Sequence, residues 1–109
     1  MNTRALEFIV PGDLHAATGG YGYDRRIITG LRELNWQVTV HALDASFPHP
    51  SPAALASAEA VLARLPDRAL VLVDGLAAGA MPSVLLTHAE RLRLVRSVFE
   101  PSSLAEVPI

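Results

Sequence analysis

The sequence of 109 residues contains no cysteine, few aromatic residues (6%) and no excess of either charge, with a formal net charge of −2 at pH 7. Without cysteine, the chain forms neither a disulfide framework nor a thiolate metal site. The near-neutral charge gives no basic surface for nucleic acid. No apolar run approaches the roughly 20 residues of a membrane span, and the amino terminus lacks a signal-peptide pattern. We therefore expect a cytoplasmic protein with no integral membrane segment and no nucleic-acid partner.

Hydrophobic residues make up 50% of the chain, which is enough for a packed core and argues against intrinsic disorder. A chain of this length forms one domain, and no linker or internal repeat divides it. We expect residues 1–109 to be a single domain. Within it, residues 96–109 are a tail whose structure the sequence leaves open. Its last part, residues 100–109, is expected to be a loop or frayed end, because it contains two prolines and shows no clear period.

Apolar strands alternate with amphipathic segments along the chain. Short apolar runs closed by turn residues indicate strands, and apolar residues at helical spacing indicate helices. Ser51 followed by Pro52 marks a helix start, and Asn35 marks a helix end because asparagine tolerates left-handed backbone. The expected strands are 6–10, 37–42, 69–73 and 92–95, the last with an extension to Phe99 left open. The expected helices are 23–34, 52–65 and parts of 77–92.

This alternation predicts an α/β fold. Successive strands joined by helices form a parallel sheet with right-handed crossovers and helices on both faces. We expect a Rossmann-like three-layer sandwich with a small parallel sheet of about four strands in the order 3-2-1-4.

Residues 8–34 are the stretch around which the rest of the chain is organised: a buried strand, a loop from Pro11 to Gly22 and a helix. Loops at this edge of a parallel sheet often bind ligands. The loop is neither a P-loop nor a dinucleotide fingerprint, because Arg25 stands where G-x-G-x-x-G requires its last glycine. Gly19 and Gly20 either let a ligand approach the backbone, with its anion at the next helix, or only form a turn.

Charged residues flank this loop and the third strand. Asp24 suits the positive end of a helix dipole, whereas cations there require an anionic partner. Arg25 and Arg26 therefore either bind a phosphate or form salt bridges. Asp74 follows the third strand, where such sheets bind ligands. It either contacts a sugar hydroxyl or acts as a base, or else it caps the following turn.

The four histidines show no metal-ligand spacing, so we predict no metal site. His15 lies in the glycine loop and is the histidine that we retain as a site candidate. His41 is expected on a sheet face, and His49 and His88 are expected at the surface. No nucleophile elbow with a Ser-His-Asp arrangement is present.

Five segments resemble the amino-terminal half of bacterial family 4 (group 1) glycosyltransferases of the GT-B fold. In order along the chain they are GGYGYDRRI, LREL, WQVTV, ALVLVDGLAAGAMP and HAERLRLV. The resemblance covers roughly residues 6–95. It implies an acceptor-side domain that faces a separate domain holding the nucleotide-sugar donor. No metal or cofactor is implied, because helix ends and basic side chains neutralise the departing diphosphate.

The resemblance also implies which residues line the cleft. The glycine pair after the first strand would lie against the donor phosphates and the acceptor, a role that falls on Gly19 and Gly20. Residues close to this pair are Tyr21, Asp24, Arg25 and Arg26. Asp74 and Gly75 would line the cleft floor.

Two features depart from the family pattern. The family usually has a histidine-containing segment ending in proline after the fourth strand, whereas this chain has Phe99 and Glu100 before Pro101. Glu100 is therefore kept only as a substitute base. The resemblance also covers no donor domain, so we expect these 109 residues alone not to position a nucleotide sugar against an acceptor.

These features give one main hypothesis and two alternatives. The main hypothesis is the amino-terminal portion of a glycosyltransferase, inactive alone and paired with a separate donor-domain chain. The first alternative is a non-catalytic module that forms a homo-oligomer through an open sheet edge beside the fourth strand. A flavodoxin-like nucleotide-binding domain is the second, although no cofactor fingerprint supports it.

Overall fold

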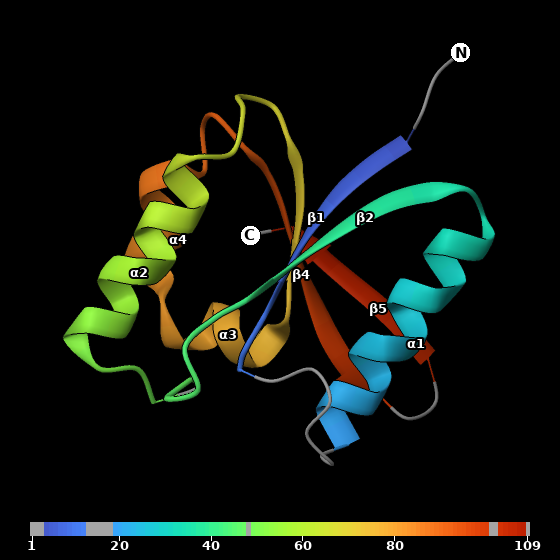
Figure 1. Ribbon diagram of the computed structural model, residues 1–109, viewed down its shortest axis with the longest axis horizontal. Helices are drawn as coiled ribbons and strands as arrows, with labels where there is room; N and C mark the ends of the chain where they lie inside the picture. The colour runs from blue at the N-terminus through green and yellow to red at the C-terminus, as the bar shows by residue number, and fades with distance from the viewer. Residues whose placement is uncertain (1–3, 13–18, 48, 101–102, 109) are drawn as a thin grey trace.

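The computed structural model describes residues 4–12, 19–47, 49–100 and 103–108. It consists of one sheet with helices on both faces (Figure 1). The elements in chain order are β1 (Arg4–Val10), α1 (Gly19–Glu33), β2 (Trp36–Ala42), α2 (Pro52–Ala63), β3 (Leu70–Val73), α3 (Gly75–Ala80), α4 (Pro82–His88), β4 (Arg93–Glu100) and β5 (Ser103–Pro108).

The sheet has the strand order β2-β1-β3-β4-β5. The first four strands are parallel, and β5 runs antiparallel to β4. The predicted α/β class and the Rossmann-like parallel sheet are confirmed, but the order 3-2-1-4 was wrong because β3 lies beside β1. The physical reason is polarity: β3 is the uniformly apolar LVLV and takes an inner position, whereas β2 exposes Gln37 and Thr39 and takes the edge.

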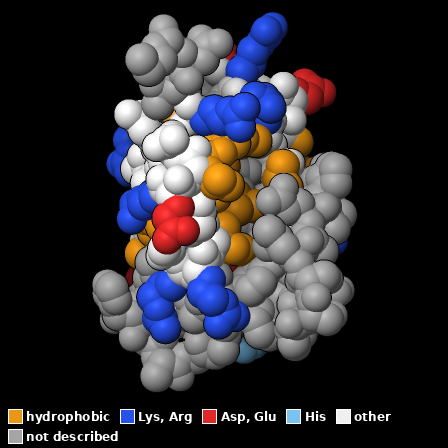
Figure 2. Space-filling view, turned by 90° about the vertical axis from the view of Figure 1, so that its right-hand side faces the viewer, with side chains coloured by type: hydrophobic (Ala, Val, Ile, Leu, Met, Phe, Trp, Pro, Cys, Tyr) orange, Lys and Arg blue, Asp and Glu red, His pale blue; other side chains and the backbone are white. Residues whose placement is uncertain are grey.

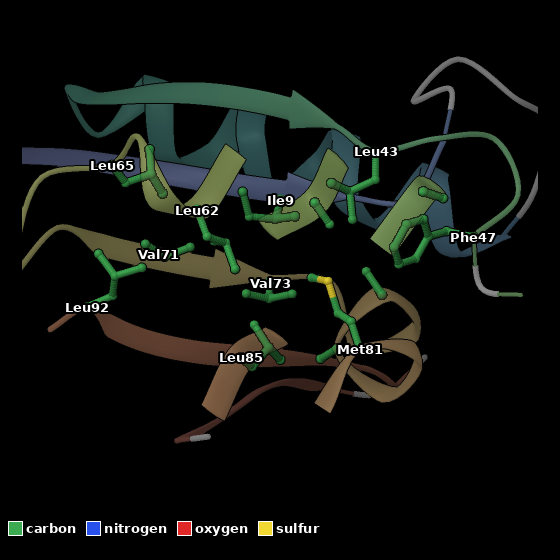
Figure 3. Packing of buried hydrophobic residues seen from close by; sticks show 14 residues of the cluster. Ile9, Leu43, Phe47, Leu62, Leu65, Val71, Val73, Met81, Leu85 and Leu92 are labelled. Atoms are coloured by element: carbon green, nitrogen blue, oxygen red, sulfur yellow. The ribbon is translucent and has the colours of Figure 1, made fainter. Parts of the chain in front are cut away.

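The core has one part on each face of the sheet. The larger part lies between the sheet and helices α2, α3 and α4, where Ile9, Val71 and Val73 pack against residues such as Leu62 and Leu85 (Figure 3). The smaller part lies under α1, where the buried residues are Leu6, Phe8, Val10, Ile28, Val38 and Leu72. Strand β1 is buried on both faces, since Phe8, Ile9 and Val10 are 0% exposed.

Helix α1 starts earlier than predicted. It begins at Gly19, so Gly19, Gly20 and Gly22 are helical and do not belong to a loop. Glycine has a poor helix propensity, but tertiary packing of an apolar face outweighs it, and Ile28 is buried against the sheet. The expected end is confirmed, because Asn35 has a φ of 70°.

The carboxyl-terminal segment is not the loop that we expected. Strand β4 extends to Glu100, and β5 pairs with it from Glu100–Ser103 to Val95–Pro108. A proline is tolerated at the end of an edge strand because no ladder amide is required there. The predicted open edge beside β4 was therefore wrong, since β5 covers it, and the two edge strands among the described residues are β2 and β5.

His88 is also placed differently from the prediction. Its side chain is buried, and its Nε2 lies 2.8 Å from Glu59 Oε1, which joins α4 to α2. Arg91 Nε donates to His88 Nδ1 at 3.1 Å, so the Nε2 atom carries the proton that Glu59 accepts. His41 lies on a sheet face, 2.8 Å from Glu7 Oε1, and His49 is exposed, as expected.

The start of α2 provides a stability prediction. Ser51 Oγ accepts a hydrogen bond from Ala54 N at 3.1 Å, and Pro52 is the first helical residue. We expect Ser51→Ala to lower the free energy of unfolding by about 1 kcal/mol, because an orphan amide of the first turn loses its acceptor. Urea denaturation measures the loss. The matched control is Ser57→Ala on the exposed side of the same helix, which should be neutral or stabilising; equal losses would contradict the cap.

Candidate functional site at the β1–β3 switch point

The strand order places a switch point between β1 and β3. From β1 the chain passes through α1 to β2 on one side, and from β3 it passes through α3 and α4 to β4 on the other side. Helix α1 packs on one face of the sheet and α3 on the opposite face. In open α/β sheets, ligands bind outside the carboxyl ends of the strands at such a point.

Two buried carboxyl groups meet there. Asp24 lies in the second turn of α1 and is 0% exposed, and Asp74 directly follows β3 and is 5% exposed. Asp74 Oδ1 accepts hydrogen bonds from Leu76 N at 2.8 Å and Ala77 N at 3.4 Å. Asp74 is thus the N-cap of α3, which was one of its three predicted roles.

The Asp24 carboxyl is neutral at physiological pH. Burial raises the pKa of Asp24 to about 9, helped by a hydrogen bond to Asp74 and by the Asp74 charge. Two carboxyls in contact do not both ionise readily, so Asp24 keeps its proton and donates it to Asp74. In agreement, no donor among the described residues bonds to either Asp24 oxygen.

Ser97 of β4 is a residue that the sequence analysis missed. The register that pairs Val73 with Arg96 places Ser97 alongside Asp74, and Ser97 is 2% exposed. Its signal in the sequence is weak: it is a small polar residue at alternate spacing from Val95. By alternation from Leu72 and Val95, Asp74 and Ser97 lie on the face of the sheet that α1 covers, so β3 and β4 are both polar there.

The other predicted site residues are placed as follows. Gly19, Gly20 and Tyr21 form the first turn of α1, and Gly75 is the first residue of α3. Arg25 is partly buried and already interacts within the protein, whereas Arg26 is exposed.

Two candidates are not brought into the site. His15 lies outside the described residues. Glu100 is the last residue of β4, and its side chain also lies outside the description.

The chemistry of this arrangement is positioning and anion binding. The carboxyl pair is buried and therefore not available to a substrate as a general base. Its role is to connect α1 to α3. The first backbone N–H groups of a helix have no partner within it and attract anions, and α1 starts at this edge of the sheet. Among the described residues, no group of three or more His, Asp or Glu side chains is placed to hold a metal ion.

Searches against protein-family models, curated proteins and solved structures found no match for this chain. The class of this protein is defined by its fold and site: it is an α/β protein with a Rossmann-like sheet and a carboxyl pair at the switch point. Within the described part, the helices are too short or too polar to cross a membrane.

Proposed function

We propose that this chain is the acceptor-side part of a glycosyltransferase, which transfers a sugar from a nucleotide-sugar donor to an acceptor. The sequence resemblance supplies the family. One observation supports it: the two segments that the resemblance assigns to the cleft, residues 19–26 and 74–75, meet at the switch point through Asp24 and Asp74.

In this proposal the residues have separate roles. The amides of Gly19 and Gly20 bind the donor phosphates, because a glycine start leaves the backbone of α1 open to a ligand. Asp24 and Asp74 are positioning residues that fix the second turn of α1 relative to the start of α3. In the family that the chain resembles, a second domain positions the nucleotide-sugar donor, so we expect residues 1–109 by themselves to bind ligand without turning it over.

The observed strand order favours a second candidate function. The order 2-1-3-4 is the flavodoxin-like arrangement, in which a mononucleotide binds at the β1–β3 switch point. A mononucleotide-binding domain without glycosyl transfer would use the same α1 amides. The two candidates differ in whether the sugar of a nucleotide sugar contributes to binding.

A thermal-shift panel tests both candidates. It contains nucleoside mono- and diphosphates, a flavin mononucleotide, nucleotide sugars and simple acceptor sugars. A ligand at about 100 times its Kd stabilises the folded state by about 2.7 kcal/mol, which raises the Tm of a domain of this size by roughly 10 °C or more. The glycosyltransferase proposal predicts the largest rise with one nucleotide sugar. An equal rise with the mononucleotide alone supports the second candidate, and no rise with any ligand contradicts both.

Two valine variants localise the binding. We expect Gly19→Val or Gly20→Val to abolish the ligand-induced rise in Tm, because a branched side chain blocks access to the amides. The matched control is Gly30→Val near the other end of α1, where an added Cβ has no atom within 4 Å. Loss of the rise in the Gly30 variant as well would place the ligand elsewhere or indicate a damaged helix.

A further inference from the structure

An apolar groove lies beside α1, away from the carboxyl edge of the sheet. Helix α1 is the only helix on its face among the described residues, and it packs over β1 and β2. The inner strands therefore leave apolar side chains in a hollow of about 130 Å³. Figure 2 shows hydrophobic side chains gathered in this hollow. The lining residues are Leu6, Leu31, Trp36, Leu70, Leu72 and Val95.

Arginines surround one end of the groove. Arg4, Arg68 and Arg93 line a second, more open depression that shares Trp36 and Leu70 with the groove. The register explains this, since Arg4 pairs with Trp36 and Arg93 with Leu70 at the amino ends of the strands. Figure 2 shows basic side chains directly beside the hydrophobic ones, and all are arginines because the sequence has no lysine.

The positive charge at this end is not neutralised within the described residues. The ion pairs among the described residues involve His41, His88 and Arg91. None of them involves the three arginines of the depression. The Arg4 guanidinium lies over the Trp36 ring, 5.7 Å from its centroid, while Arg68 and Arg93 are exposed. An arginine fork binds a carboxylate through two hydrogen bonds, so the end of the groove is complementary to acidic side chains.

The size of the groove indicates the kind of occupant. The apolar groove itself, at about 130 Å³, is smaller than the roughly 300–1,000 Å³ of most small-molecule sites and accommodates one or two aliphatic side chains. The adjoining arginine depression, at about 520 Å³, is shallower and more open to solvent. Amphipathic helices bind to apolar grooves by such anchors at i, i+3 or i+4 and i+7. A helix that lies beside α1 in the same direction ends at the arginines, because α1 itself ends next to Trp36.

We propose that this groove binds an amphipathic helix of a partner protein, with aliphatic anchors along one face and acidic residues in its last turn. The arginines then meet both the acidic side chains and the negative end of the helix dipole. This surface is separate from the switch-point site, so the proposal does not depend on the proposed function.

Two synthetic helical peptides of about 18 residues, or five turns, test this surface. They share an identical leucine face and differ in the last turn, which contains glutamates in one and lysines in the other. Trp36 is the single tryptophan of the chain and lines the groove, so its emission reports occupancy directly. We expect a saturable blue shift with the acidic peptide and a Kd about tenfold lower than that of the basic peptide.

The double variant Arg68→Glu/Arg93→Glu is expected to reverse this preference. Both side chains are exposed, so the fold should be kept, which circular dichroism checks. The matched control is Arg64→Glu, an exposed arginine at the end of α2 on the opposite face, and it should leave both Kd values unchanged.

Three results would overturn the proposal. The first is the absence of a saturable change in Trp36 emission with either peptide. The second is unchanged affinity of the double variant for the acidic peptide. The third is a dimer of the chain in light scattering that the double variant dissociates, since the occupant would then be a second copy.

Discussion

Raising the pH from about 5 to about 9 is expected to destabilise this protein, and Asp24→Asn is expected to remove most of that dependence. The pKa of Asp24 rises from 3.8 to about 9 in the folded state, because the group is buried against Asp74. Between these two values the folded chain holds a proton that the unfolded chain has released. The free energy of unfolding therefore falls with pH, by up to about 1.4 kcal/mol per pH unit.

The sign of this effect is opposite to that of most carboxylates. The stabilisation that Asp24 gives the folded state is fully present below its pKa in the unfolded chain. It is lost as the pH rises through its pKa in the folded chain. Asp44 behaves in the usual way, since hydrogen bonds from Ser46 lower its pKa. The stabilisation that Asp44 gives the folded state is lost only as the pH falls in the acid range, so it does not obscure the effect of Asp24 between pH 5 and 9.

Urea denaturation at a series of pH values measures the slope. Asparagine has the shape of the protonated acid, and its amide still donates to Asp74, so the Asp24→Asn variant should be folded and nearly independent of pH in this range. The control is Glu90→Gln at an exposed position, which should keep the wild-type slope. A wild-type slope in the Asp24→Asn variant would show that Asp24 is already ionised in the folded state.

The features that depend on neighbouring residues were predictable from the sequence. Ser51 and Pro52 start α2 because a hydroxyl cap and a proline at the first position satisfy or avoid orphan amides. Asn35 ends α1 because its left-handed backbone is a local property. The alternation of strands and helices gave the α/β class for a similar reason: each crossover joins segments close in the sequence.

The features that depend on distant residues were not predictable. The position of β3 beside β1 is decided by which strand tolerates the edge of the sheet. His88 is buried because Glu59 and Arg91 satisfy its two nitrogens, and helical spacing does not reveal such partners.

At the candidate site, the contact between the two carboxyl groups was also not predictable from the sequence. Asp24 and Asp74 were both site candidates, but their contact joins a helix to the end of a strand about 50 residues further along the chain, and local patterns do not reveal such a contact.

The second large effect is expected at Arg91, outside the candidate site. Arg91→Met should lower the free energy of unfolding by about 2–4 kcal/mol, since several hydrogen bonds from one charged group are lost together. Its Nη2 donates to Leu62 O at 2.6 Å and its Nη1 to Leu65 O at 2.8 Å. Leu62 lies in the last turn of α2, where its carbonyl also accepts from Leu65 N at 3.1 Å, and Leu65 follows the helix. A cation is favourable at this end of a helix.

Three further variants separate the geometry of Arg91 from its charge. Arg91→Lys keeps the charge but does not span several acceptors, so it should recover less than half of the loss. Asp67→Asn removes only an ion pair in which the Asp67 side chain is 80% exposed, and such pairs contribute at most about 1 kcal/mol. Arg93→Met is the matched exposed control and should stay within about 0.5 kcal/mol of wild type in urea denaturation. Full recovery in Arg91→Lys would mean that charge alone stabilises this end of α2, and equal losses in Arg91→Met and Arg93→Met would mean that the carbonyl contacts contribute nothing.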